Sequence, residues 1–184
     1  MGDYFMGIEA RQREFFKIVK ARSDENEKAF ALLMQGECYA LVGATIRMEL
    51  DSLIRLFDYK GADDSRKEQL LDEFFKGRSW SKLEWKLVES MSSTIGWTEH
   101  IYKFCCAFVH LSPYHDWATN DNIPNLTRKR RRLIVQELRN QQNDTWGYDT
   151  TLSIEEDFTF SDLILFAPHI FKKLRGNLLC ELGY

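Results

Sequence analysis

The stretch Asp24–Tyr59 reads DENEKAFALLMQGECYALVGATIRMELDSLIRLFDY. Its large apolar residues recur at a near-heptad spacing, at Leu32, Tyr39, Ile46, Leu50, Leu53 and Phe57. A stripe with this spacing is typical of a helix that packs lengthwise against others in a bundle. Ser23 and Asn26 stand at the spacing of an N-terminal capping box, and Gly61 is typical of the position after a helix end. We therefore predict one long helix from about Asp24 to Tyr59.

The same helical period continues on both sides of this stretch. We expect further helices over residues 3–19, 64–75, 79–91, 97–111, 127–141 and 160–182, with a loop over 112–126 and a short irregular or extended segment over 143–158. Gly77 is expected to close the 64–75 helix, and Ser161 to cap the last helix, which contains Pro168. The pattern predicts a single all-α domain over residues 1–184, an up-and-down helical bundle with one long helix.

The composition agrees with one compact domain and limits the function. The chain has 184 residues, of which 44% are hydrophobic, and a net charge of -3, so it is not a polycation that grips nucleic acid by charge alone. It contains no apolar run long enough for a transmembrane helix and no basic, apolar start typical of a secretory signal. Four cysteines within apolar patterns predict buried thiols in a reducing cytoplasm: Cys38, Cys105, Cys106 and Cys180.

The clearest chemical pattern lies in the predicted helix over 97–111. Glu99, Lys103 and His110 fall on one stripe of such a helix, with small side chains between the lysine and the histidine. The opposite side carries apolar residues, namely Ile101, Tyr102, Phe104, Cys105, Phe108 and Val109. An ammonium group and an imidazole that open onto small side chains are able to hold a phosphate. The sequence therefore predicts a phosphate-binding stripe.

A second pattern surrounds Arg47 on the predicted long helix. Small residues lead up to it on one face, at Gly36, Ala40 and Gly43 or Ala44. Arg47, Asp51 and Arg55 then follow at four-residue intervals and form a ladder of alternating charge. If this face meets the stripe of Lys103 and His110, Arg47 joins the same pocket.

Three short segments are similar to one family. They are Ile46-Arg47-Met48-Glu49, then Tyr102-Lys103 with Phe108-Val109-His110-Leu111-Ser112, and the chain end from Phe160-Ser161-Asp162-Leu163 through Phe171-Lys172-Lys173-Leu174 to Asn177-Leu178. Together they resemble the HEPN-like superfamily of small helical bundles from prokaryotic toxin–antitoxin, abortive-infection and CRISPR-associated defence systems. The resemblance loosely covers most of the chain, and its specific part is short.

The resemblance implies an RNA-binding protein, a homodimer, and an antitoxin or other partner protein. Catalytic members are metal-independent endoribonucleases in which an Arg and a His act at a dimer interface. Here Lys103 stands in place of that Arg, and Phe104 in place of the Asn that follows it. The resemblance therefore implies His110, Lys103 and Arg47 as catalytic residues, with Arg47 supplying the guanidinium. Supporting or binding roles fall to Tyr102, Asp51, Ser112, His115, Arg130 and Arg131.

Each of these residues also has a structural interpretation. His110 is able to bond a loop carbonyl at a helix end, Lys103 to pair with Glu99, and Arg47 to form a buried ion pair with Asp51. The alternative function is accordingly a non-catalytic helical interaction module that binds a partner protein or a nucleotide.

The only dense basic run is Arg128-Lys129-Arg130-Arg131-Arg132. It fits a patch that contacts an RNA backbone, and it equally fits the exposed start of the 127–141 helix. No metal or cofactor is expected. The cysteines and histidines around His110 lack the paired spacing of a zinc site, and the sequence has no phosphate loop or dinucleotide motif.

Overall fold

The computed structural model describes residues 7–78, 80, 84–92, 98–99, 101–102, 105 and 160–184, with α7 side chains from Ala167 onward. These residues form helices and no strand, so the predicted all-α bundle is confirmed. The helices are α1 (Ile8–Gln35), α2 (Tyr39–Gly61), α3 (Asp64–Phe75), α4 (Glu84–Ser92) and α7 (Phe160–Leu182). Residues 98–99, 101–102 and 105 are also helical. Within these ranges, no helix combines the length and apolar character needed to cross a membrane.

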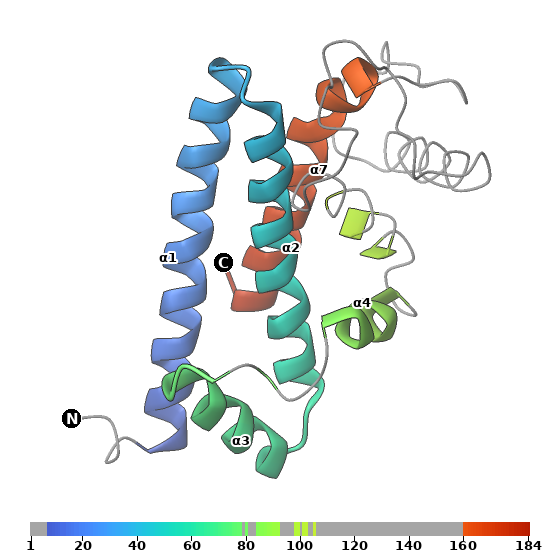
Figure 1. The fold of residues 1–184 in the computed structure, drawn as a ribbon. Helices are drawn as coiled ribbons and strands as arrows, with labels where there is room; N and C mark the ends of the chain where they lie inside the picture. Colours follow the sequence, from blue (N-terminus) through green and yellow to red (C-terminus); the bar gives the residue numbers. More distant parts are fainter. Residues whose placement is uncertain are drawn as a thin grey trace.

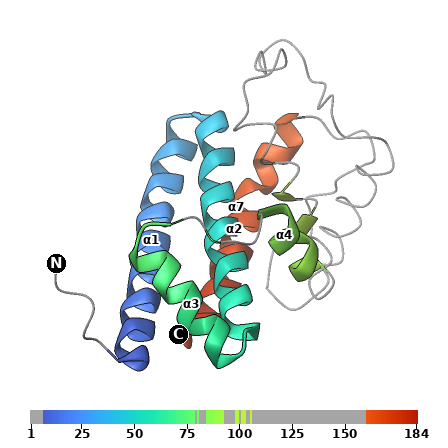
Figure 2. The same ribbon diagram turned by 60° about the horizontal axis from the view of Figure 1, so that its bottom comes forward.

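α2 is the central helix of the bundle and contacts each of the other four. Figure 1 shows α1 and α2 side by side and antiparallel, joined by a tight turn at one end. α7 runs along α2, and α3 lies across the opposite end of the α1–α2 pair (Figures 1 and 2). In both views α4 lies beside α2 on the side away from α1.

The core forms where the apolar face of α2 meets its neighbours. Ile46, Leu50 and Leu53 of α2 are fully buried, as their place in the apolar stripe predicts. Phe15 of α1 anchors an aromatic cluster at one end of the bundle, with partners from three other segments: Tyr59, Phe74 and Trp80. Phe30 of α1 stacks on Phe171 of α7, with ring centroids 4.4 Å apart.

The predicted long helix over 24–59 is wrong, because the chain turns at Gly36–Cys38 instead of at Ser23. α1 runs without interruption through Ser23, whose hydroxyl is buried and bonds to α2 rather than capping a helix. At the turn Glu37 has a left-handed φ of 55°. The predicted stripe therefore fails at its first member: Leu32 is 68% exposed.

Other boundaries agree closely with the sequence pattern. α3 spans 64–75 as predicted, and Gly77 follows it with a φ of 64°. α7 spans 160–182 as predicted and contains Pro168.

The predicted 3–19 helix is wrong at both ends, because Gly7 is extended, with a ψ of 160°, and α1 continues from Ile8 to Gln35. The predicted start of a helix at 79 is also wrong, because Trp80 is not helical and the described part of α4 begins at Glu84.

Several predictions fall outside the described residues altogether. These are most of the 97–111 helix, the loop over 112–126, the basic helix over 127–141 and the irregular segment over 143–158. The prediction of buried thiols is confirmed for Cys105 and wrong for Cys38 and Cys180, which are exposed. Both exposed cysteines lie near helix ends, where an apolar neighbourhood in sequence does not guarantee burial.

Candidate functional site

Three predicted site residues are described: Arg47, Asp51 and Tyr102. The remaining predicted site residues lie outside the described residues, namely Lys103, His110, Ser112, His115, Arg130 and Arg131. Their catalytic and binding roles therefore stay predictions.

The described residues between 98 and 105 pack one helical face onto the bundle. Thr98, Ile101 and Cys105 are buried, and Tyr102 is partly buried. Their spacing of three and four residues is that of a single helical face. The prediction that Ile101, Tyr102 and Cys105 belong to the apolar side of this helix is thus confirmed.

Arg47 of α2 meets this face at Tyr102. Its guanidinium carbon lies 3.8 Å from the centroid of the Tyr102 ring, a cation–π contact. Its Nη2 forms an ion pair with Oε1 of Glu84 at 2.5 Å, and the Tyr102 hydroxyl donates to the other oxygen of Glu84 at 3.5 Å. Arg47 therefore meets the apolar side of this segment, at Tyr102, and the expected meeting with the stripe of Lys103 and His110 lies outside the described residues.

The chemistry of this contact is that of a structural clamp. Only 12% of the Arg47 side chain is exposed, and its Nη2 is neutralised by Glu84. The predicted ion pair with Asp51 is wrong, since Glu84 is the partner. The second guanidinium nitrogen, Nη1, is buried and has no hydrogen-bond partner among the described residues. Arg47 thus joins α2, α4 and the Tyr102 segment.

Asp51 holds two other arginines. Its Oδ1 accepts a hydrogen bond of 2.8 Å from Nε of Arg55, and its Oδ2 accepts one of 3.3 Å from Nη1 of Arg22 on α1. Half of the predicted ladder, Asp51 to Arg55, is therefore confirmed. Arg55 also lies over the ring of Trp80, with its guanidinium carbon 5.4 Å from the centroid.

The sequence interpretation missed a buried polar cluster between α1, α2 and α7. Glu49 is fully buried and accepts hydrogen bonds from the Ser23 hydroxyl at 2.5 Å and from Nδ2 of Asn26 at 2.8 Å. Arg175 of α7 donates to the Ser23 hydroxyl oxygen at 2.6 Å and to Asp24 at 2.8 Å. The available signal was a glutamate beside Leu50 on the core face of α2, because a carboxylate there requires buried donors.

In this cluster, cations and carboxylates stabilise one another's charged forms. Burial acts to lower the pKa of Arg175, but the hydrogen bond to Asp24 and the carboxylates of Glu27 and Glu49 outweigh it, so its pKa is raised. Hydrogen bonds from Lys20 and then from Arg175 lower the pKa of Asp24. Ser23 is fully buried, so no substrate reaches its hydroxyl. The cluster fixes helices and offers no open catalytic group.

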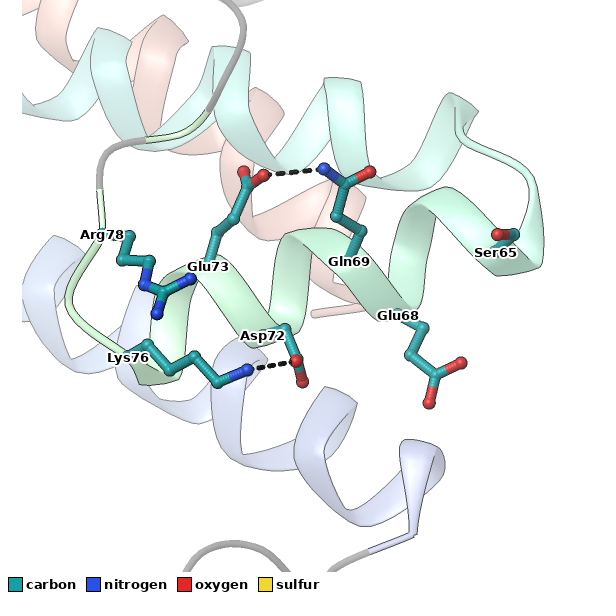
Figure 3. A pocket seen from close by; sticks show the side chains of 7 residues that line it. All are labelled: Ser65, Glu68, Gln69, Asp72, Glu73, Lys76 and Arg78. Carbon is teal, nitrogen blue, oxygen red and sulfur yellow. Dashed lines mark hydrogen bonds and ion pairs between the residues drawn. The ribbon is translucent and has the colours of Figure 1, made fainter.

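A surface pocket of about 400 Å³ lies along the outer face of α3 (Figure 3). Its lining mixes acids and bases: Ser65, Glu68, Gln69, Asp72, Glu73, Lys76 and Arg78. Asp72 pairs with Lys76 at 2.6 Å and with Arg11 of α1 at 2.5 Å, and these two bonds lower its pKa. The acids are therefore engaged within the protein. Among the residues described, no group of three potential ligands is placed to hold a metal ion.

The candidate site thus consists of three polar clusters centred on residues of α2, namely Arg47, Asp51 and Glu49.

Comparisons of the chain with protein-family models, with curated proteins and with solved structures find no match.

Proposed function

We propose that this chain is an RNA-binding helical protein of the HEPN-like type, which contacts RNA phosphates through the stripe of Lys103 and His110. The proposal combines the sequence resemblance with the way in which the 98–105 segment meets the bundle. Metal-independent cleavage of the bound RNA is the activity that the stripe would support. A cytoplasmic setting fits the free thiols of the described cysteines, Cys38, Cys105 and Cys180.

One observation carries the proposal: the buried face of residues 98–105. Thr98, Ile101 and Cys105 face the core, and Tyr102 covers Arg47. Successive residues of an α-helix are about 100° apart, so Lys103 and His110 on a continuous helix would point about 140° away from that buried face. Such a stripe would face solvent, where RNA can reach it.

The role of Arg47 in this proposal is positioning. Glu84 neutralises its Nη2 and the Tyr102 ring covers its guanidinium, so Arg47 holds the Tyr102 segment on α2 instead of contacting phosphate directly. Lys103 is the next residue after Tyr102 in the chain. A displacement of Tyr102 would therefore also displace Lys103, the first cation of the stripe.

The proposed reaction needs no metal. The ribose 2′-hydroxyl attacks the adjacent phosphorus, and the bond from phosphorus to the 5′ oxygen breaks. His110 accepts the proton of the 2′-hydroxyl or donates a proton to the leaving 5′ oxygen, and water takes part in the other transfer. Lys103 stabilises the charge that gathers on the phosphoryl oxygens. The products are a 2′,3′-cyclic phosphate end and a 5′-hydroxyl end.

The test of cleavage compares His110→Ala with a matched histidine variant, His169→Ala, in a half-buried position of α7. The purified full chain is incubated with labelled single-stranded RNA in the presence of a chelator, and cyclic phosphate ends are quantified. We expect His110→Ala to lower the rate by about 10²–10⁴-fold, the usual contribution of a general acid or base. Equal rates for wild type and His110→Ala would contradict the catalytic role.

The test of binding compares Lys103→Gln with Lys86→Gln, an exposed lysine of α4 that serves as the charge-matched control. We expect Lys103→Gln alone to weaken RNA binding in a fluorescence anisotropy titration. Equal affinities of the two variants would contradict the stripe as the RNA contact.

A second candidate function is a non-catalytic interaction module, and the neutralised Arg47 favours it. One of the three residues expected to be catalytic, Arg47, is engaged by Glu84. This candidate predicts RNA or partner binding without cleavage, with His110→Ala changing stability alone. It also predicts that Arg130→Glu with Arg131→Glu weakens the partner. Sedimentation at increasing concentration tests the homodimer that the resemblance implies, and co-purification tests an antitoxin.

A further inference from the structure

We infer that Arg22 and Arg55 form a phosphate-binding site beside the α1–α2 interface, which holds a backbone phosphate of the RNA. This inference deepens the proposed function and, for its RNA ligand, rests on it. The site itself is defined by three described residues: the two arginines and Asp51, to which both bind.

The two guanidinium groups are neighbours because they share one carboxylate. Asp51 accepts from Nε of Arg55 at 2.8 Å through one oxygen and from Nη1 of Arg22 at 3.3 Å through the other. Each arginine therefore approaches Asp51 along one edge only. The remaining N–H groups of both guanidinium forks have no hydrogen-bond acceptor among the described residues.

The Arg55 guanidinium is held in place before any ligand arrives. Asp51 fixes its Nε edge, and the Trp80 ring lies beneath it at 5.4 Å. Trp80 is itself only 8% exposed and packs on Phe15 of the aromatic cluster. An arginine restrained in this way loses less conformational freedom when it binds, which favours recognition of an anion by its free fork.

The net charge of this site and its exposure to solvent both favour the binding of a phosphate. Two cations face one anion, which leaves a positive charge to meet a phosphodiester. The Arg22 side chain is 43% exposed and the Arg55 side chain 29%, whereas Asp51 lies deeper, at 17%. A tetrahedral phosphate offers oxygens to two guanidinium groups at once.

The site lies on the same helix as Arg47, which positions the Tyr102 segment. Arg47, which contacts Tyr102, and Arg55 are eight residues apart on α2, a rise of about 12 Å. Arg55 therefore lies about two helical turns along α2 from the arginine that holds the Tyr102 segment.

The experiment measures binding of a single-stranded RNA oligonucleotide by fluorescence anisotropy at several salt concentrations. It compares wild type with the double variant Arg22→Gln/Arg55→Gln. The matched control is Arg13→Gln, which removes an α1 arginine whose side chain is 75% exposed. We expect the double variant to bind at least about tenfold more weakly, since two charge-assisted contacts to a phosphate are lost. Its salt slope should fall by about 0.7, the value for one phosphate of a single strand.

A second arm measures the melting temperature in inorganic phosphate and compares it with the value in chloride at equal ionic strength. Phosphate should raise the Tm of wild type and Arg13→Gln more than that of the double variant, because a ligand stabilises the folded state that binds it. Arg55→Lys serves if the double variant fails to fold, since lysine keeps the charge and loses the fork. We expect Arg55→Lys to weaken RNA binding about threefold or more, and unchanged binding would overturn the site.

The outcomes separate the two proposals. If the double variant and Arg13→Gln bind RNA equally, the Arg22/Arg55 site is overturned and RNA binding stands. If wild type binds no RNA but phosphate stabilises it through the two arginines, RNA binding fails and the site takes a small phosphate. If wild type binds no RNA and phosphate does not raise its Tm, both proposals fail.

Discussion

Glu49 shows how a single residue determines the packing of three helices. Its carboxylate is fully buried between Ser23 and Asn26 of α1, and Arg175 of α7 reaches the same Ser23 hydroxyl. A buried carboxylate is costly unless donors surround it, so an arrangement of the helices that supplies these donors is favoured over one that does not. We infer that this cluster selects the arrangement of α1, α2 and α7.

The first prediction concerns the replacement of this carboxylate. Glu49→Leu leaves two buried donors without an acceptor, and we expect it to lower the free energy of unfolding by about 3 kcal/mol or more. Glu49→Gln keeps one acceptor oxygen and should cost about half as much. Urea unfolding followed by circular dichroism measures both values.

The control is Glu25→Gln, on the exposed side of α1, which should change stability by less than about 0.5 kcal/mol. A Glu49→Leu protein as stable as wild type would show that apolar packing replaces the cluster. The role of Glu49 in fixing the three helices would then be refuted.

At the scale of elements, helices with strong local end signals were predicted well. Asp63 caps α3 by accepting a hydrogen bond from the Arg66 amide, and Gly77 supplies the left-handed residue beyond its end. Both signals agree with the burial of Leu70 and Leu71 on the helix face that meets the core. The boundaries of α3 therefore follow from sequence alone.

The α1–α2 turn could not be predicted in the same way, because two local signals competed. Ser23 has the side chain and spacing of a cap, but its partner is Glu49, distant in sequence. At the true turn Gly36 is the competing helix-end signal, but the left-handed φ falls on the next residue, Glu37. Ser23 is thus bonded across the bundle inside an uninterrupted α1, a contact that local spacing does not reveal.

The second prediction tests the strain at this turn. A non-glycine residue in the left-handed region costs about 1–2 kcal/mol, and glycine avoids most of that cost. We expect Glu37→Gly to raise the free energy of unfolding by about 1 kcal/mol, visible as a higher Tm. The matched variant Glu25→Gly lies inside α1 and should lower stability by about 1 kcal/mol. A destabilised Glu37→Gly protein would argue against strain at this turn.

At the scale of the whole molecule, the candidate sites show that sequence spacing does not predict which helix supplies the partner of a charged residue. Arg47, Asp51 and Arg55 stand at regular intervals on one helix, yet Arg47 turns to Glu84 while Asp51 binds Arg22 of α1. Helical spacing predicts which residues are neighbours on α2 and says nothing of which helix lies opposite. Those partners come from segments 29 or more residues away.

The packing of α7 against α1 also involves residues that are far apart in the sequence. Arg175 of α7 bonds to Ser23 and Asp24 of α1, more than 150 residues earlier in the sequence. Contacts of such separation form only after a large loop is closed, so they belong to the folded whole and not to any local signal. Ion pairs of this kind make the stability of the bundle depend on pH.

The third prediction concerns acid. Asp24 and Asp72 have pKa values lowered by their hydrogen bonds, from Lys20 and Arg175 and from Lys76 and Arg11 respectively. Because the unfolded chain binds protons more readily at these two positions, their stabilisation is complete above about pH 4, the ordinary aspartate pKa, and is lost as the pH falls through the lower folded values. We therefore expect Asp24→Asn/Asp72→Asn to be less stable than wild type at pH 7, with the difference shrinking toward pH 2.

Urea unfolding of both proteins from pH 7 to pH 2 measures this difference. His169, whose pKa is lowered by burial and by Lys172, also loses stabilisation on acidification, but it does so in both proteins and cancels. Asp64→Asn is the control, since the Asp64 side chain is 99% exposed and its removal should leave the pH profile unchanged. A wild-type-to-variant difference that stays constant across the whole pH range would mean that these two carboxylates do not couple protonation to folding.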